Sequence, residues 1–188
     1  MRLNDPLVTS FIYNGKEYAI NFAFDVVLDA FDWLDRKDLR DHEKAEICLE
    51  LLLGESLQGL EAVELWNYIY EEFIEMKQEK RIEYDLQGNP MPTKKDDDNK
   101  RLIDFEKDAA HIYASFRQAY GINLFEEHGK MHWHEFRALF QGLPADTSMK
   151  WIMRIRAWEP SKGESNEHKQ NMRELQKIHA LDDPEEVD

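Results

Sequence analysis

Three histidines near the middle of the chain have the spacing that most resembles a metal site. His128 and His132 are four positions apart, as two ligands on one helix face would be, and His134 adds a His-x-His pattern. However, Gly129 disfavours a continuous helix through the first two. Structural zinc also needs a fourth ligand, and catalytic zinc needs a carboxylate at a known spacing. We therefore interpret these histidines as loop and helix-start residues that flank Trp133.

A second group, Asp104, Asp108 and His111, could support acid–base catalysis, since the three lie along one strip of a predicted helix. The two aspartates already have a structural explanation, Asp104 as an N-cap and Asp108 as a first-turn acid favoured by the helix dipole. The sequence contains no glycine-rich phosphate loop, nucleophile elbow or paired-cysteine motif. Its single cysteine, Cys48, lies in an apolar helical pattern typical of a buried thiol. We expect no catalytic residue, cofactor site or metal site, and hence a non-enzymatic protein.

A third group favours protein binding. Trp151 and Trp158 are seven positions apart on a predicted helix, with Arg154 between them. Tryptophan and arginine dominate the energetics of many protein interfaces, so this face could bind a partner helix. The alternative is that both tryptophans simply close the protein core.

The elements around these groups follow from apolar spacing. Residues 104–143 predict two helices that fold back on each other across a turn marked by Gly121. The first stripe comprises Phe105, Ala109, Ile112, Tyr113, Phe116 and Tyr120, and the second comprises Trp133, Phe136, Phe140 and Leu143. Both stripes have the period of half-buried helices. We expect this pair to form the centre of the core.

The N-terminal part predicts a β-hairpin over residues 7–20, since Asn14-Gly15 is the pair that best tolerates a type I′ turn. Helices are expected over about 22–34, 41–53 and 57–78. Their expected inward-facing residues are Phe24, Val27, Leu28, Phe31 and Leu34 in the first, Ile47, Cys48, Leu51 and Leu52 in the second, and Leu60, Val63, Trp66, Tyr70 and Phe73 in the third.

The rest of the chain predicts a linker and two more helices. Residues 84–100 contain glycine, prolines and three consecutive aspartates, which indicates a mobile linker. Helices are expected over about 147–158 and 167–180, the second with only Met172, Leu175 and Ile178 on its apolar side. The expected segments are 1–83 (hairpin and acidic helices), 84–100 (linker), 101–160 (central pair and Trp helix) and 161–188 (C-terminal helix and acidic tail), in one globular unit overall. The fold class is mainly α, a helical bundle of about six to seven helices with a small N-terminal β-hairpin.

Charge is distributed unevenly along the chain, whose formal net charge is −15. Residues 45–76 contain eight glutamates and no lysine or arginine, whereas residues 101–158 are close to neutral. An acidic surface disfavours binding to nucleic-acid phosphates. It could serve as a solvated, self-repelling surface, bind a basic partner or mimic DNA. Neither a signal peptide nor an apolar run of membrane-spanning length is visible, so we expect a cytoplasmic protein without a membrane partner.

Several segments together resemble the bacteriophage gene-product-fifteen family of tailed phages and prophages of Gram-positive hosts. They are LNDPL, NGKEYAINF, DFEKDAAHIYASFRQAYGINL, and HWHEFRALFQGL leading into MKWIMRIR. The similarity covers nearly the whole chain. Two positions depart from the family pattern: Ala19 follows Tyr18 where a proline is usual, and His134 stands where a second aromatic residue is common.

The resemblance implies a role in tail morphogenesis, because the family is encoded between the tail tube and tape-measure genes. It implies a tail assembly chaperone in the host cytoplasm, which binds the tape-measure protein and helps recruit tail tube subunits. Two alternatives remain open. One is a permanent structural tail or connector component of the virion, and the other is an acidic inhibitor of a host DNA-binding enzyme.

Overall fold

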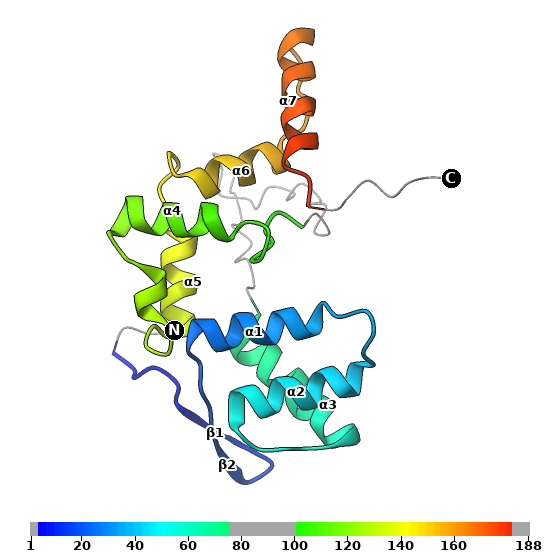
Figure 1. The fold of residues 1–188 in the computed structure, drawn as a ribbon, viewed down its shortest axis with the longest axis vertical. Coiled ribbons are helices and arrows are strands. Elements are labelled where there is room, and N and C mark those ends of the chain that lie inside the picture. The colour runs from blue at the N-terminus through cyan, green and yellow to red at the C-terminus, as the bar shows by residue number, and fades with distance from the viewer. Residues whose placement is uncertain (1–3, 76–100, 182–188) are drawn as a thin grey trace, which may run out of the picture. The chain divides into compact units, whose positions relative to one another are not determined.

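The computed structural model describes residues 4–75 and 101–181, which form a hairpin and seven α-helices (Figure 1). Two short helical segments accompany them, the π-helix η1 (Tyr70–Ile74) and the 3-10 helix η2 (Leu124–Glu127). The expected fold class, a mainly α bundle with an N-terminal hairpin, is confirmed. The expected linker and the acidic residues after Leu181 lie outside the described residues.

The chain divides into two compact units. Unit 1 comprises Met1–Lys77 and Asn123–Gly142, and unit 2 comprises Gln78–Ile122 and Leu143–Asp188. The division separates the two helices expected to pair, α4 (Ala109–Tyr120) and α5 (Trp133–Gln141). Within their own units, α4 packs against α6 (Ser148–Ala157), and α5 packs against α1 (Phe24–Leu34). Each apolar stripe therefore has its main packing partner inside its own unit, rather than in the other stripe as the sequence suggested.

Unit 1 begins with the predicted hairpin, formed by β1 (Ser10–Tyr13) and β2 (Lys16–Ala19). The strands pair antiparallel with Phe11 opposite Tyr18, and these two rings stack with centroids 5.6 Å apart. Asn14 and Gly15 have φ angles of 48° and 79°, as a type I′ turn requires. An isolated hairpin is marginally stable, and this one gains packing from Phe11 against Phe73 of η1.

Three helices follow the hairpin. Helix α2 (Asp41–Leu53) has the predicted bounds and packs against both α1 and α3 (Gly59–Ile69). Cys48 is fully buried, as predicted, and its thiol donates to the carbonyl of Ala30. The expectation that Leu60 faces inward is wrong, because its side chain is 73% exposed. The buried face of α3 is instead Ala62, Leu65, Trp66 and Ile69.

Helix α5 is tied to the N-terminal part of unit 1 by a short antiparallel bridge. The amide of Phe24 donates to the carbonyl of Met131, and the amide of Trp133 donates to the carbonyl of Phe22. Trp133 is fully buried, and its indole Nε1 donates to the carbonyl of Ile74. Its ring packs against Phe31 and Phe136, and Phe136 in turn stacks on Phe24 and Phe140.

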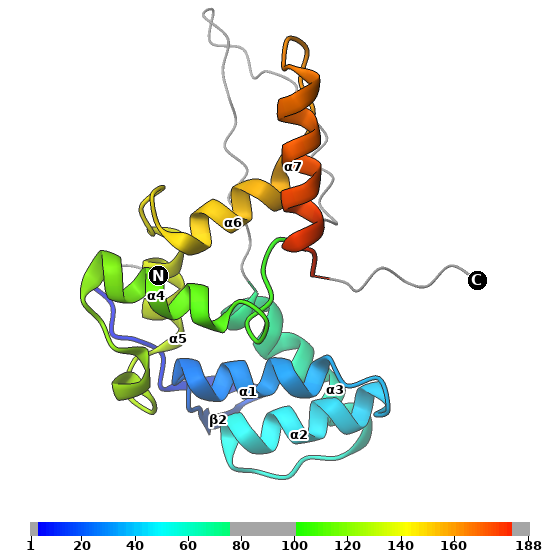
Figure 2. The same cartoon turned by 45° about the horizontal axis from the view of Figure 1, so that its top comes forward.

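Unit 2 contains α4, α6 and α7 (Asn166–Ile178). Helix α4 begins at Ala109, four residues later than expected, because residues 105–108 form a turn. The expectation that Asp104 is the N-cap of this helix is wrong, because Asp108 holds that position. The Oδ1 of Asp104 instead accepts from the amides of Glu106 and Lys107 in the preceding turn. In both views, α7 stands away from α4, with its C-terminal end nearest α6 (Figures 1 and 2).

Candidate partner-binding surface

Helix α6 places two of the three candidate interface residues on its exposed side. Met149, Ile152 and Ile155 form its buried side, at spacings that follow the helical period. The opposite side therefore carries Arg154, which is exposed, and Trp151, which is 43% exposed. An exposed tryptophan beside an exposed arginine is a combination enriched in protein interfaces.

The third candidate residue, Trp158, lies just beyond the helix. Its backbone is extended, with φ −65° and ψ 136°, because α6 ends at Ala157, three residues before Pro160. Its half-buried indole meets the ring of His168 edge-on, with centroids 6.1 Å apart. The structure thus does not place Trp151 and Trp158 on one continuous helix, and only the former is strongly exposed.

Helix α7 lies beside this surface and is held there mainly through its C-terminal turns. The Gln176 side-chain amide donates to the carbonyls of Ile155 at 2.9 Å and Trp158 at 2.8 Å. These carbonyls belong to the last turn of α6 and its C-cap, where helices lack internal partners. The ring of His179 meets Trp151 edge-on, with centroids 5.4 Å apart. The α6 surface is therefore bordered by α7 of the same chain.

A buried ion pair that the sequence analysis missed underlies this arrangement. Arg156 binds Asp108 through two bonds, Nη1 to Oδ2 at 2.6 Å and Nη2 to Oδ1 at 2.7 Å. The same guanidinium donates to the carbonyls of Leu102 and His179. It therefore joins the segment before α4, the start of α4 and the end of α7. The sequence could have indicated the burial of Arg156, because the helical period places it on the same side of α6 as Met149 and Ile152.

This ion pair changes the interpretation of Asp108, which is only 2% exposed. The expectation of a first-turn acid is wrong, because Asp108 is the N-cap residue of α4. Burial by itself would raise its pKa, but hydrogen bonds from Arg156 and the link to the Asp104 backbone outweigh burial and hold the pKa below its ordinary value. His111, the third member of that group, shares a 2.8 Å hydrogen bond between Nδ1 and Ser148 Oγ. All three candidate acid–base residues are thus engaged in local structure.

The candidate metal-binding histidines also have structural partners. His132 Nε2 donates to the carbonyl of Val8, which leaves Nδ1 to accept from the amide of His134 at the start of α5. The ring of His128 packs edge-on against Phe24. Burial, assisted by electrostatic repulsion from His132 and Arg137, lowers the pKa of His134 to about 4. No three His, Cys, Asp or Glu side chains converge as metal ligands within residues 4–75 and 101–181.

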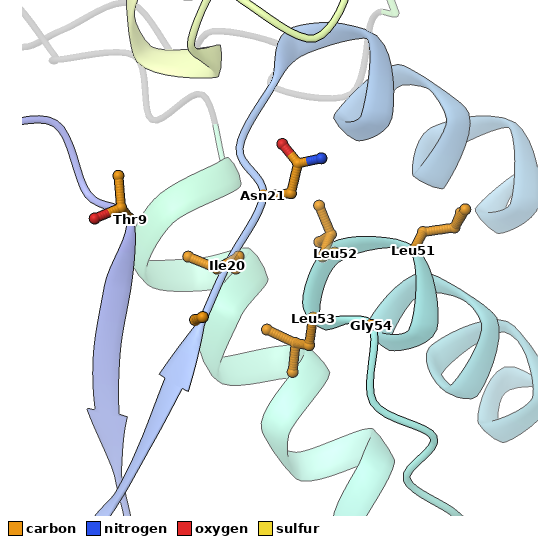
Figure 3. Close-up of a pocket in the computed structure, with 8 residues that line it drawn as sticks. Thr9, Ile20, Asn21, Leu51, Leu52, Leu53 and Gly54 are labelled. Atoms are coloured by element: carbon orange, nitrogen blue, oxygen red, sulfur yellow. The ribbon is translucent and has the colours of Figure 1, made fainter.

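A shallow open groove of about 550 Å³ lies in unit 1, between the hairpin and the C-terminal end of α2 (Figure 3). Its lining comprises Thr9, Ala19, Ile20, Asn21 and the stretch Leu51 to Gly54. None of these side chains can exchange a proton near neutral pH or act as a strong metal ligand. The groove therefore provides apolar and amide contacts only.

Comparison with known proteins gives the origin of the chain. The model of the Bacteriophage Gp15 protein family matches residues 3–181. The chain belongs to this family. The resemblance found in the sequence is thereby confirmed, and it supports a structural or morphogenetic role in a phage. No curated protein and no solved structure matches the chain. No described helix combines the length and the hydropathy needed to cross a bilayer.

Proposed function

We propose that this Gp15 family member is a non-enzymatic tail assembly chaperone of the host cytoplasm. It would bind the tape-measure protein and help recruit tail tube subunits. Family membership supports a phage role, and the observation that carries the binding function is the exposed pair Trp151 and Arg154 on α6. Side chains of these two types can supply most of the energy of an interface.

The physical need for such a protein follows from the nature of a tape measure. A long amphipathic helical protein exposes an apolar stripe, which promotes aggregation until another surface covers it. A reversible cover needs a modest apolar contact with polar surroundings rather than a deep pocket. Trp151 supplies such a contact, and Arg154 can pair with acidic groups beside the stripe.

The test is co-expression of this chain with the tape-measure protein of the same phage. The wild-type chain should keep the tape measure in the soluble fraction, and the variant Trp151→Ala/Arg154→Ala should lose most of that effect. Lys162→Ala is the matched control, because Lys162 is exposed in the segment between α6 and α7. Circular dichroism should show that all three chains fold alike. Tape-measure solubility that does not depend on the wild-type chain would contradict the proposal.

A permanent tail or connector component is the first alternative, and mass spectrometry of purified virions separates it from a chaperone. A chaperone should be depleted from mature particles, whereas a structural component should be present at a fixed copy number.

An inhibitor of a host DNA-binding enzyme is the second alternative, and the charge of unit 1 favours it. The described residues of unit 1 include 20 acidic and seven basic side chains. Such an inhibitor should compete with DNA for its target, and the competition should weaken with added salt.

A further inference from the structure

Helix α7 exposes an amphipathic surface that the rest of unit 2 leaves open. None of its 13 residues is buried, and Ile178 is 72% exposed although it belongs to the apolar side of the helix. Met172 and Leu175 are only half-buried on that side. A helix of this composition is usually stabilised by covering its apolar side. Here the contacts with α6 cover only part of it.

Three cations run along α7 in a row that faces away from Leu175, and we call them the basic ridge. Lys169, Arg173 and Lys177 follow at intervals of four residues, which places them in one row about 12 Å long. None of the three forms an ion pair with another described residue. The ridge is therefore free to pair with carboxylates outside unit 2.

Helix α3 in unit 1 presents a complementary surface, which we call the acidic face. It comprises Leu60, Glu61, Glu64 and, on η1, Glu71, all of them exposed. Leu60 is the most exposed large apolar side chain of the described residues, at 73%. The three glutamates form no ion pair with another described residue. The acidic face thus combines an exposed apolar side chain with unpaired negative charge.

The overall charges of the two units reinforce this complementarity. Acidic side chains outnumber basic ones by 20 to seven in the described part of unit 1, whereas basic side chains outnumber acidic ones by ten to eight in that of unit 2. Two copies of the chain would therefore attract each other when unit 2 of one approaches unit 1 of the other. Unit 1 would repel a second unit 1.

We propose that α7 of one copy docks on the acidic face of a second copy, with the basic ridge on the glutamates. Such an interface is heterologous, since the two copies contribute different surfaces. After two copies join, one of them still has a free α7 and the other a free acidic face. Further copies can therefore add, and the assembly either closes into a ring or remains an open chain. The inference goes beyond the proposed chaperone function, because it concerns this chain alone.

The test is sedimentation velocity of the full chain over a range of concentrations. The wild type should associate as concentration rises, and the association should weaken by about tenfold or more between roughly 0.05 M and 0.5 M salt. The ridge variant Lys169→Glu/Arg173→Glu/Lys177→Glu should remain monomeric. The face variant Glu61→Lys/Glu64→Lys/Glu71→Lys should remain monomeric as well. Lys162→Glu and Asp29→Lys, which change exposed charges elsewhere, should associate like the wild type.

Mixing the two monomeric variants makes the test specific. The ridge variant keeps an intact acidic face, and the face variant keeps an intact basic ridge, so one native interface can form between them. The mixture should associate where each variant alone does not, because the two native surfaces can meet and the reversed ridge and reversed face are also opposite in charge. Circular dichroism should show that both variants remain helical. The proposal would be overturned by a wild type that stays monomeric or by association that survives charge reversal. It would also be overturned if the ridge variant and the wild type were both monomeric but differed in hydrodynamic radius. The last would place the contact within one chain.

Discussion

Unit 1 and unit 2 are both helical with buried apolar side chains, but the core of unit 2 also contains a buried ion pair. Around Trp133, unit 1 packs aromatic rings whose neighbouring centroids lie 5.0 to 6.1 Å apart. Unit 2 places Arg156 at its centre, with hydrogen bonds to Asp108 and to two backbone carbonyls. The first arrangement depends on apolar burial, which is not directional, whereas the second depends on geometry and charge.

The same contrast appears at the surfaces of the units. Unit 1 has many fully buried side chains beneath an acidic exterior, whereas α7 of unit 2 has no buried residue. A helix with little burial opens more readily than the helices of a packed core. The comparison indicates that unit 1 is the rigid part of the protein and that the outer part of unit 2 can adapt to a partner.

The largest expected effect is that of removing the centre of the aromatic cluster. Trp133→Ala should lower the free energy of unfolding by about 3–5 kcal/mol, because it leaves a cavity and an unpaired carbonyl at Ile74. Urea denaturation measures the loss, and hydrogen exchange should localise it to unit 1. Phe125→Ala is the control, since this ring is 71% exposed and its removal should cost less than about 0.5 kcal/mol. Similar losses for the two variants would contradict the aromatic account of unit 1.

Breaking the ion pair should have the next largest effect, confined to unit 2. Arg156→Met leaves the Asp108 carboxylate buried without its partner, at an expected cost of about 3 kcal/mol. Removing both charges in Arg156→Met/Asp108→Leu should recover much of this stability, because no buried charge then remains. Arg154→Met is the matched control on the exposed side of α6. If the double variant is no more stable than the single one, the charge of Asp108 is not the cause.

Most helices and the hairpin could be predicted from the sequence because their signals are local. The Asn14-Gly15 turn, the bounds of α2 and the ends at Gly54 and Gly121 follow from backbone preferences of single residues. The packing partner of α5 could not be predicted this way. The bridge that joins Phe22 and Phe24 to residues 131–133 uses backbone hydrogen bonds, which leave no side-chain pattern. Periodicity identified an apolar stripe without identifying what covers it.

The candidate surface was predictable to a similar extent. The positions of Trp151 and Arg154 on the exposed side of α6 could be predicted, because the spacing of the apolar residues around them shows which side of the helix is buried. Trp158 falls outside the helix, and Arg156 is buried although arginine is usually exposed. Its partner, Asp108, is 48 residues away, and no local pattern links the two.

Acid should affect unit 1 at a higher pH than it affects the ion pair of unit 2. Burial lowers the pKa of His134 from its ordinary 6.5 to about 4, so its contribution to stability is present above 6.5 and is lost as the pH falls toward 4. The pKa of Asp108 is held below its ordinary 3.8, so its contribution persists above 3.8 and is lost only as the pH falls through the lower folded value. Stability measured between about pH 7 and pH 5 should therefore decline through unit 1. His179 should add to this decline in unit 2, because burial and the neighbouring His111 and Arg156 lower its pKa as well.

Two variants separate these contributions. His134→Gln should flatten the decline between about pH 7 and pH 5, whereas Asp108→Asn should lower stability at both values by a similar amount. His128→Gln is the control, because His128 is exposed. A decline that is unchanged in His134→Gln would assign the pH dependence to another group.

The smallest expected effect tests whether α7 is held mainly by its end. Gln176→Ala removes the side-chain donor to the carbonyls of Ile155 and Trp158, and should cost about 1 kcal/mol. Because little else buries α7, hydrogen exchange should speed up along residues 166–178 and stay unchanged in unit 1. Gln170→Ala removes an exposed glutamine from the same helix and should leave exchange nearly unaltered. Faster exchange in α5 as well would mean that the two units open together, and the contrast between a rigid and an adaptable part would then fail.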